Sequence, residues 1–287
     1  MTEPTARPAP VPGGGSGRDT RLGPLILTVF GLYARSEDNW LSVASVVRLM
    51  SDLGLDEGAV RSSVSRLKRR GVLRPERHGK AAGYSLEGST LEILAEGDTR
   101  IFERTRADAG DGWLLVVFSV PESEREKRHE LRVSLTQLGF GTAAPGVWVA
   151  PGNLAAEVRR TLERRGLSGY VDLFSGDHMA FGPLTGKVRE WWDLDELAGL
   201  YLEFLRQYRP VLDRARADGA TPLDAFRTYV PMLTQWRRMP YRDPGLPLRL
   251  LPQDWSGETA GLLFDDLHQA LGAPAREHAM TVIHSDG

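Results

Sequence analysis

Cationic side chains gather in one short segment of the chain, where they could bind phosphate groups. Between Arg61 and Lys80 eight residues are Lys or Arg and one, Glu76, is acidic, so the segment carries a net charge of eight minus one, or +7. The whole chain of 287 residues carries only -2. A concentrated positive patch on a nearly neutral chain is typical of a surface that docks onto phosphate. This segment is therefore the first candidate for a nucleic-acid interface.

A helix accounts for the first half of the basic segment. Val60, Val64 and Leu67 recur at helical spacing and form one apolar stripe. Asp56 is suited to the N-cap and Gly71 to the position after the last turn. The opposite side and its flanks carry donors suited to base edges and phosphates, namely Arg61, Ser62, Ser65, Arg66, Lys68 and Arg69. This side of the helix is the predicted DNA-reading face.

A basic hairpin is predicted directly after this helix. Val72 and Leu73 begin a strand, residues 76–83 form a polar loop with two glycines, and residues 84–86 return as a second strand. The tip of the loop carries Arg77, His78 and Lys80. A tip of this kind would follow the DNA backbone or enter the minor groove, where the potential is most negative.

Two further helices are needed to position the basic helix. An apolar stripe over residues 43–53, with Ser42 as its cap, gives the spacing of a helix-turn-helix. A first helix over Pro24–Arg35, with its proline in the first turn, supplies the third side of a small core. Either basic element alone would more often be a solvated surface. Their order and spacing predict a winged helix-turn-helix domain over residues 21–100.

The pattern changes after residue 110 to strands that alternate with helices. Strands are predicted at 113–120, 140–143, 147–150 and 169–174, and helices at 123–138 and 153–165, the latter capped by Asn153. The order strand, helix, strand, strand, helix, strand predicts a ferredoxin-like βαββαβ domain over residues 111–182. Enzymes and binding modules share this fold, so it does not by itself indicate a function.

The remaining segments complete an α+β multidomain chain. Residues 187–275 predict a mostly helical C-terminal domain, in which Pro231 predicts a kink or a broken helix. Residues 1–20 are rich in Pro, Gly and Ala and predict a disordered tail. Residues 276–287 predict a loose terminus.

A proline-rich loop after residue 235 holds a second group of candidate binding residues. Arginine side chains beside aromatic faces could hold the phosphates and adenine of a coenzyme A thioester. The candidates are Trp236, Arg237, Arg238, Tyr241 and Arg242. The same loop could instead form a structural clasp in which Asp243 pairs with Arg237 or Arg242, and the sequence favours the clasp.

The composition and the missing motifs restrict the function. The chain has no cysteine, which excludes disulfides and cysteine-based metal sites. It has no GxSxG, HExxH or Walker A motif, and its six histidines show no metal-ligand spacing. No apolar stretch approaches the length of a membrane span, and the first residues lack the apolar core of a signal peptide. We therefore expect a cytoplasmic protein that is not an enzyme and has no cofactor or metal.

Several segments also resemble the PaaX family, bacterial repressors of phenylacetic acid catabolism. The segment VRSSVSRLKRRGVLRPERHGKAAGYSL resembles the helix and wing of that family. Downstream, GFGTAAPGVWVAP (139–151), WWDLDELAGLYLEFL (191–205) and DPGLPLRLLPQDWSGETA (243–260) resemble its central and C-terminal motifs in the same order. The resemblance covers roughly residues 22–275. It implies a Cas2-like central domain and an effector such as phenylacetyl-CoA or a related acyl-CoA.

The resemblance to Cas2 does not extend to nuclease chemistry. In Cas2 proteins the first strand ends near a metal-binding aspartate, whereas the matching position here is Ser119 and residues 113–121 contain no acid. A hard divalent cation prefers carboxylate oxygen, so a nuclease is not favoured.

The sequence therefore predicts a DNA-binding transcriptional regulator, a repressor that an effector releases from its operator. Symmetry of an inverted-repeat operator in double-stranded DNA implies a homodimer. Two alternatives stay open: an acyl-CoA-binding metabolic protein, and an RNA-binding module that uses the same basic surface. RNA is less favoured because no exposed aromatic platform accompanies the basic patch.

Overall fold

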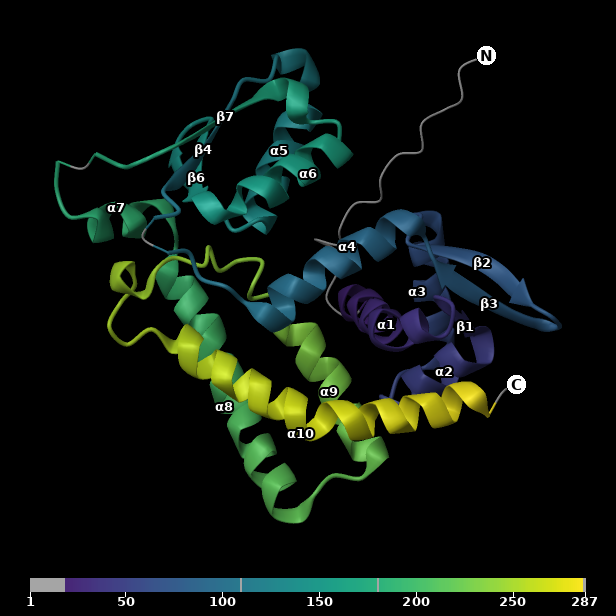
Figure 1. Ribbon diagram of the computed structural model, residues 1–287. Coiled ribbons are helices and arrows are strands. Elements are labelled where there is room, and N and C mark those ends of the chain that lie inside the picture. The colour runs from purple at the N-terminus through teal and green to yellow at the C-terminus, as the bar shows by residue number, and fades with distance from the viewer. Residues whose placement is uncertain (1–18, 109, 180, 286–287) are drawn as a thin grey trace, which may run out of the picture. The chain divides into compact units, whose positions relative to one another are not determined.

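The computed structural model describes residues 19–108, 110–179 and 181–285 (Figure 1). Among these residues the chain divides into two compact units. Unit 1 contains residues 19–98, 207–236 and 262–285, and unit 2 contains residues 99–206 and 237–261. Each unit therefore combines segments that are far apart in the sequence.

The first part of unit 1 has the predicted order of three helices followed by a hairpin. Its elements are α1 (Asp19–Tyr33), the short helix η1 (Ala34–Ser36), β1 (Trp40–Ser42), α2 (Val43–Asp52), α3 (Glu57–Arg69), β2 (Leu73–His78), β3 (Ala81–Leu86) and α4 (Gly88–Asp98). The strands form an antiparallel sheet of order β1-β3-β2. Buried side chains from the helices and strands, among them Phe30, Leu41 and Leu49, form the core beneath α3.

Helix α1 begins earlier than the sequence suggested. It starts at Asp19 and contains Pro24, so the prediction that this proline opens the helix is wrong. A proline in the second turn removes only one helical hydrogen bond, and the additional turn buries Leu22, which is 7% exposed. The predicted disordered tail is thus wrong for residues 19 and 20, and its remaining residues, 1–18, lie outside the described part of the chain.

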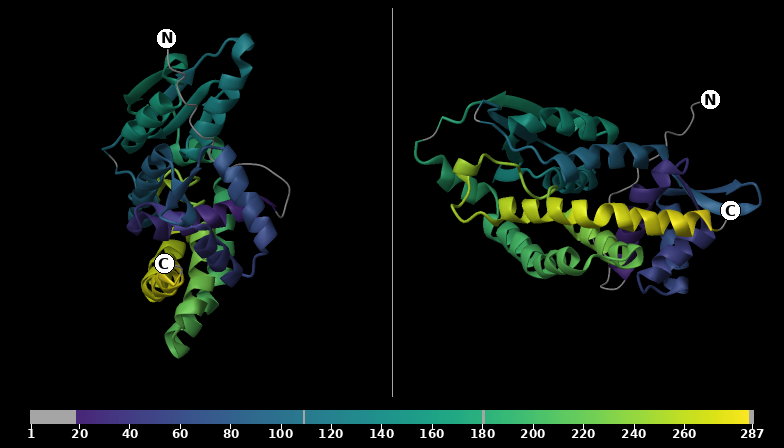
Figure 2. Two further views of the ribbon diagram at one scale, coloured as in Figure 1. Left: turned by 90° about the vertical axis from the view of Figure 1, so that its right-hand side faces the viewer. Right: turned by 60° about the horizontal axis from the view of Figure 1, so that its bottom comes forward.

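The hairpin strands are longer than predicted. Strands β2 and β3 pair along their whole length from Leu73 opposite Leu86 to His78 opposite Ala81. The turn therefore consists of Gly79 and Lys80, and the predicted loop over residues 76–83 is wrong. Gly79 has a φ of 58°, which glycine adopts without steric cost. Polar residues can form such strands because the hairpin projects beyond α1, α2 and α3 into solvent (Figures 1 and 2).

Unit 1 is completed by segments from the second half of the chain. Helix α8 (Leu194–Asp218) enters it at residue 207, α9 (Pro222–Trp236) follows, and α10 (Ser256–His284) contributes residues from 262 onward. Helix α9 continues through Pro231, so the broken-helix alternative is wrong. The loose terminus is wrong for residues 276–284, which continue the single long helix α10 (Figure 2). Residues 286 and 287 lie outside the described residues.

Unit 2 contains the predicted alternation of strands and helices. The elements are η2 (Thr99–Glu103), β4 (Trp113–Phe118), η3 (Glu122–Glu124), α5 (Arg125–Gln137), β5 (Gly141–Ala144), β6 (Val147–Pro151), η4 (Gly152–Leu154), α6 (Ala155–Arg164), η5 (Ser168–Tyr170), β7 (Val171–Gly176), α7 (Leu184–Trp191) and η6 (Leu248–Leu250). The strands form an antiparallel sheet of order β5-β6-β4-β7. Asn153 lies in the short turn η4 and does not cap α6, which begins two residues later.

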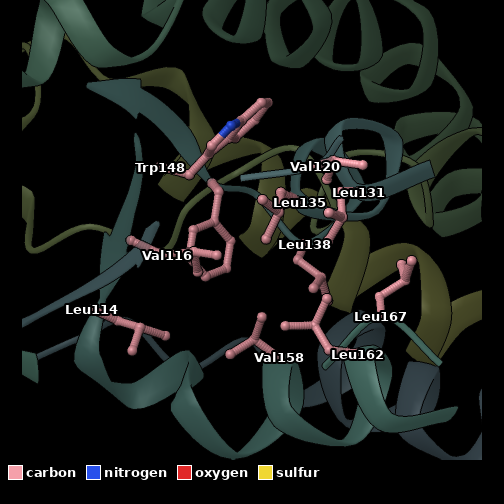
Figure 3. Close-up of a cluster of buried hydrophobic side chains, with 12 residues drawn as sticks. Leu114, Val116, Val120, Leu131, Leu135, Leu138, Trp148, Val158, Leu162 and Leu167 are labelled. Carbon is pink, nitrogen blue, oxygen red and sulfur yellow. The ribbon is translucent and has the colours of Figure 1, made fainter. Parts of the chain in front are cut away.

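One face of this sheet packs on α5 and α6. Leu114 and Val116 of β4 and Trp148 of β6 belong to one buried cluster with Leu135 of α5 and Val158 of α6 (Figure 3). Alternate residues of a strand point to opposite faces, which explains why Leu115 and Val117 are absent from this cluster. The central domain thus buries an ordinary apolar core between its sheet and its helices.

Candidate nucleic-acid interface

Helix α3 presents the predicted basic face to solvent. As expected, the Asp56 carboxylate caps the helix, because its Oδ1 accepts a hydrogen bond from the Ala59 amide at 2.9 Å. Val60, Val64 and Leu67 are buried and fix the helix on the core. The side chains left exposed are those of Arg61, Ser62, Ser65, Lys68 and Arg69, while Arg66 is half-buried. The structure therefore brings the predicted helix residues together on one side of unit 1.

Two of these cations already have partners on the same helix. Arg61 pairs with Glu57 at 2.6 Å between Nη2 and Oε1, and Arg66 donates to the Ser62 hydroxyl at 3.1 Å. Exposed pairs of this spacing contribute only about 0.3–0.5 kcal/mol. The exposed ion pair with Glu57 is weak enough to leave the Arg61 guanidinium able to turn toward a phosphate or a base edge.

The hairpin separates two of its predicted contact residues. Arg77 and His78 are neighbours in β2 and therefore point to opposite faces of the hairpin. Arg77 donates from Nη2 to the Lys80 carbonyl oxygen at 2.9 Å and so braces the turn. Arg77, His78 and Lys80 are all exposed. One DNA strand cannot meet Arg77 and His78 from the same side of the hairpin.

Glu76 organises the face of the hairpin that carries His78. Its carboxylate accepts a hydrogen bond from the Ser85 hydroxyl and lies 3.3 Å from Arg74 Nη2 and 3.4 Å from His78 Nε2. The Ser85 hydrogen bond lowers the pKa of Glu76, and the contacts with His78 and Arg74 lower it further. The acid inside the basic segment thus serves to hold the hairpin together.

Trp40 is a residue of this region that the sequence did not single out. Its ring stacks on the His78 imidazole, with centroids 4.3 Å apart and planes inclined by 14°. No local pattern marks Trp40, because its partner is 38 positions away in the chain. Gly83, which the sequence analysis placed in the loop, lies inside β3. A glycine within a strand often marks a close approach of another group, so the signal was lost when the strand was predicted too short.

The predicted effector residues do not form one exposed surface. Trp236 is fully buried and stacks on Phe264, with centroids 4.6 Å apart, so it is a core residue of unit 1. Burial lowers the pKa of Arg237 to about 10, while Arg238 is exposed. The remaining two residues have protein partners in unit 2: Arg242 Nη2 lies 2.5 Å from Glu196 Oε1, and the Arg100 guanidinium lies 5.1 Å from the Tyr241 ring centroid.

The contacts of Asp243 differ from the predicted clasp, because its partners Tyr201 and Arg106 were not among those that the sequence named and lie in the same unit. The Tyr201 hydroxyl donates to Asp243 Oδ2 at 2.8 Å, and Arg106 Nη2 lies 3.6 Å from the same oxygen. Burial and the Asp243 carboxylate raise the pKa of Tyr201 well above its ordinary value. Because both partners are distant in the sequence, local spacing pointed to the neighbouring arginines Arg237 and Arg242 instead.

Three further features that the sequence analysis considered are the Cas2 aspartate position, metal sites and membrane-spanning helices. Ser119, at the Cas2 aspartate position, is exposed just after β4. Within residues 19–108, 110–179 and 181–285, no group of three or more His, Asp or Glu side chains could hold a metal ion. Over the same residues, no helix has the length and apolar character needed to cross a membrane.

Three sequence profiles match the chain in consecutive segments. They are described as PaaX-like protein over residues 21–90, PaaX protein central Cas2-like domain over residues 106–188, and PaaX-like protein C-terminal domain over residues 192–281. Together they span most of the chain, from the first helix of unit 1 to the last turns of α10.

Similar whole proteins agree with these profiles. The transcriptional repressor PaaX of Escherichia coli (strain K12) is 30% identical over 259 residues, which cover 88% of this chain and 80% of that protein. The solved structure of the uncharacterized protein Rv0674 from Mycobacterium tuberculosis superposes with a TM-score of 0.57. It is 22% identical, and the match covers 88% of this chain and 97% of that one, so this likeness concerns the fold alone.

Proposed function

The chain belongs to the PaaX family, whose members are transcriptional repressors and not enzymes. We propose that this protein represses transcription by binding an operator in double-stranded DNA. The observation that carries this proposal is the exposed cationic face of α3, which the buried Val60, Val64 and Leu67 stripe holds outward. Phosphate contacts from such a face position a protein on DNA, and base contacts give it specificity.

In this proposal unit 1 contains a winged helix-turn-helix. Helix α3 is the recognition helix, and β2 and β3 form the wing. Ser62, Arg66 and Arg69 follow one another at intervals of four and three residues on the solvent side of α3. That spacing allows them to face successive bases along the major groove. Lys80, at the turn of the wing, would contact the backbone beside this groove. We also assign the central domain of unit 2 to the ferredoxin-like fold, and its strand order β5-β6-β4-β7 supports this assignment.

The operator would be an inverted repeat bound by a homodimer. Each copy would place one α3 in one half-site, and the protein's two-fold symmetry would match that of the DNA. If one recognition helix moved relative to the other, it would no longer align with its half-site, and the affinity of the dimer for the operator would fall.

We propose that the effector that causes this displacement is an acyl-CoA thioester such as phenylacetyl-CoA. The guanidinium of Arg238 is exposed and suits a phosphate, whereas Arg242 would have to exchange Glu196 for the ligand and Tyr241 would have to exchange Arg100 for an adenine. Arg237, the remaining cation of the set, is half-buried. Trp236 leaves the candidate set because it is buried in the core of unit 1. The assignment of the effector depends on the family resemblance described above.

A mobility-shift experiment tests both parts of the proposed function. The purified protein is mixed with duplex DNA from upstream of its own gene, with scrambled duplex and single-stranded RNA of equal length as competitors, while phenylacetyl-CoA is titrated. We expect specific duplex binding that the thioester abolishes. Specific binding that ignores the thioester would contradict the effector assignment alone. Equal affinity for scrambled duplex or for RNA would contradict the repressor.

A further inference from the structure

The face of the β1-β3-β2 sheet that carries Glu76 and His78 is crossed by one aromatic side chain. We propose that Trp40 is a positioning residue for DNA binding. It fixes the end of the wing so that the Gly79–Lys80 turn meets the DNA backbone. This inference rests on the proposed function, because it assigns a task to the wing of the same DNA-binding unit. Trp40 itself need not touch DNA.

Trp40 reaches the wing from the strand on the far side of the sheet. Trp40 lies opposite Ser85 of β3 in the sheet register, yet its ring stacks on His78 of β2, the last residue before the turn. The indole Nε1 also donates to the Glu76 carbonyl oxygen at 3.4 Å. The side chain therefore spans the middle strand and contacts the third one at two positions.

Gly83 provides the space for this crossing. A Cβ atom at this position would lie 2.4 Å from Trp40 Cε2 and 2.4 Å from the Leu41 carbonyl oxygen. Gly83 is not among the residues with positive φ, so the glycine serves to admit the indole and the nearby β1 backbone and not to relax its own backbone. The absence of a side chain here and the position of Trp40 belong to one arrangement.

The stack links the wing to the buried core. The neighbour of Trp40 in β1 is Leu41, which is fully buried, so β1 is anchored in unit 1. A two-stranded hairpin alone is marginally stable and twists readily. Contact from an anchored strand at His78 therefore restrains the residue that precedes the Gly79–Lys80 turn. On its edge, the same His78 ring faces the Glu76 carboxylate at 3.4 Å.

The test compares two substitutions of Trp40, one that keeps an aromatic ring and one that removes it. Trp40→Phe retains an aromatic face for His78, whereas Trp40→Leu keeps an apolar side chain over Gly83 but has nothing to stack. Operator affinity is measured as a function of salt for the wild type, both variants and Lys80→Ala, with thermal unfolding to verify that each is folded. Loss of one phosphate contact lowers the salt slope by about one, which is the value expected for Lys80→Ala.

We expect Trp40→Leu to approach the slope of Lys80→Ala, to bind the operator about fivefold more weakly near 0.15 M salt, and to lose backbone protection at the edge of a hydroxyl-radical footprint. Trp40→Phe should retain the wild-type slope and footprint. Wild-type values for both variants, or an equal loss in both, would overturn the role of the stack while leaving the repressor intact. If the wild type lacked specific binding, the proposed function itself would fail.

Discussion

At the scale of single residues, Arg69 offers the most direct test of the α3 surface. It is exposed in the last turn of α3, beyond the buried Leu67. Arg69→Ala should weaken specific operator binding by about 1–3 kcal/mol if the side chain reads a base, and relax specificity at one position. Fluorescence anisotropy with the operator and single-base variants measures both effects.

A matched control removes the same charge elsewhere in unit 1. Arg216 on α8 is exposed and pairs with Asp266 at 3.1 Å, outside the basic segment. Arg216→Ala should leave the affinity unchanged. An Arg69→Ala variant with wild-type affinity and specificity would remove this residue from the interface.

Glu76 gives a prediction about acid stability. Its pKa is lowered in the folded protein, so its stabilising contribution is fully present above the ordinary value of 4.5 and is lost as the pH falls through the folded-state pKa. Urea unfolding should show that Glu76→Gln is less stable than wild type at neutral pH and that the difference shrinks as the pH falls below 4.5.

The Ser85 hydroxyl identifies the origin of this pH dependence. Its hydrogen bond is the largest cause of the lowered pKa of Glu76. The difference in free energy of unfolding between the protein with Glu76 and the Glu76→Gln variant should therefore depend less on pH when both also carry Ser85→Ala. If this difference in free energy of unfolding stayed constant between neutral and acidic pH when Ser85 is present, Glu76 would not have a lowered pKa in the folded protein.

At the scale of elements, local signals predicted α3 well and the hairpin poorly. The Asp56 cap, the apolar stripe and Gly71 act within a few residues of the helix, so the sequence shows them directly. The extent of β2 and β3 depends on pairing between strands, and polar residues paired as readily as apolar ones. Trp40 was missed for the same reason, because its role arises only when β1 joins the sheet.

The end of α10 was mistaken for a loose terminus because its buried residues are small. Ala275 and Ala279 are fully buried, yet alanine contributes little to an apolar pattern. The neighbouring polar side chains also have specific partners in unit 1. His278 Nε2 lies 2.8 Å from Asp52 Oδ2 at the end of α2, and Arg276 donates to the Ser36 hydroxyl at 3.0 Å. Helix α10 is therefore part of unit 1 from residue 262 onward.

Overpacking this contact should destabilise unit 1. Ala279→Leu adds methyl groups where no surface is exposed and should lower the free energy of unfolding by about 1–3 kcal/mol. Glu277→Leu introduces the same side chain at an exposed position two residues earlier and should change stability by no more than about 0.5 kcal/mol. Urea denaturation compares the two. Equal stability of both variants would mean that residue 279 is not packed against unit 1.

At the scale of the whole molecule, the compact units differ from the sequence segments that the family profiles match. The first profile ends at residue 90, but unit 1 also requires residues 207–236 and 262–285. The sequence could not show this, because apolar periodicity identifies a helix without revealing which core it joins. Helices α8 and α10 each begin in unit 2 and end in unit 1.

The proposed symmetry of binding is a prediction about the complete complex. Light scattering of the protein with a duplex that contains the whole operator should give two chains per duplex, because each half-site accommodates one α3. A duplex with a single half-site serves as the control and should bind more weakly. One chain on the full operator would contradict the dimer while leaving the DNA contacts of α3 untouched.

The division of unit 1 between the two ends of the chain also has a consequence during protein synthesis. Its first segment ends at Asp98 and its last begins at Leu262, so 163 residues, 99–261, lie between them. At about 5–20 residues per second, the ribosome needs roughly ten to thirty seconds to cover that distance. Throughout this interval the nascent α1, α2 and α3 lack the helix that completes their core. A ribosome that stops before α10 therefore releases a polypeptide whose unit 1 is unfinished, although all of α3 and the β2–β3 hairpin has already been translated.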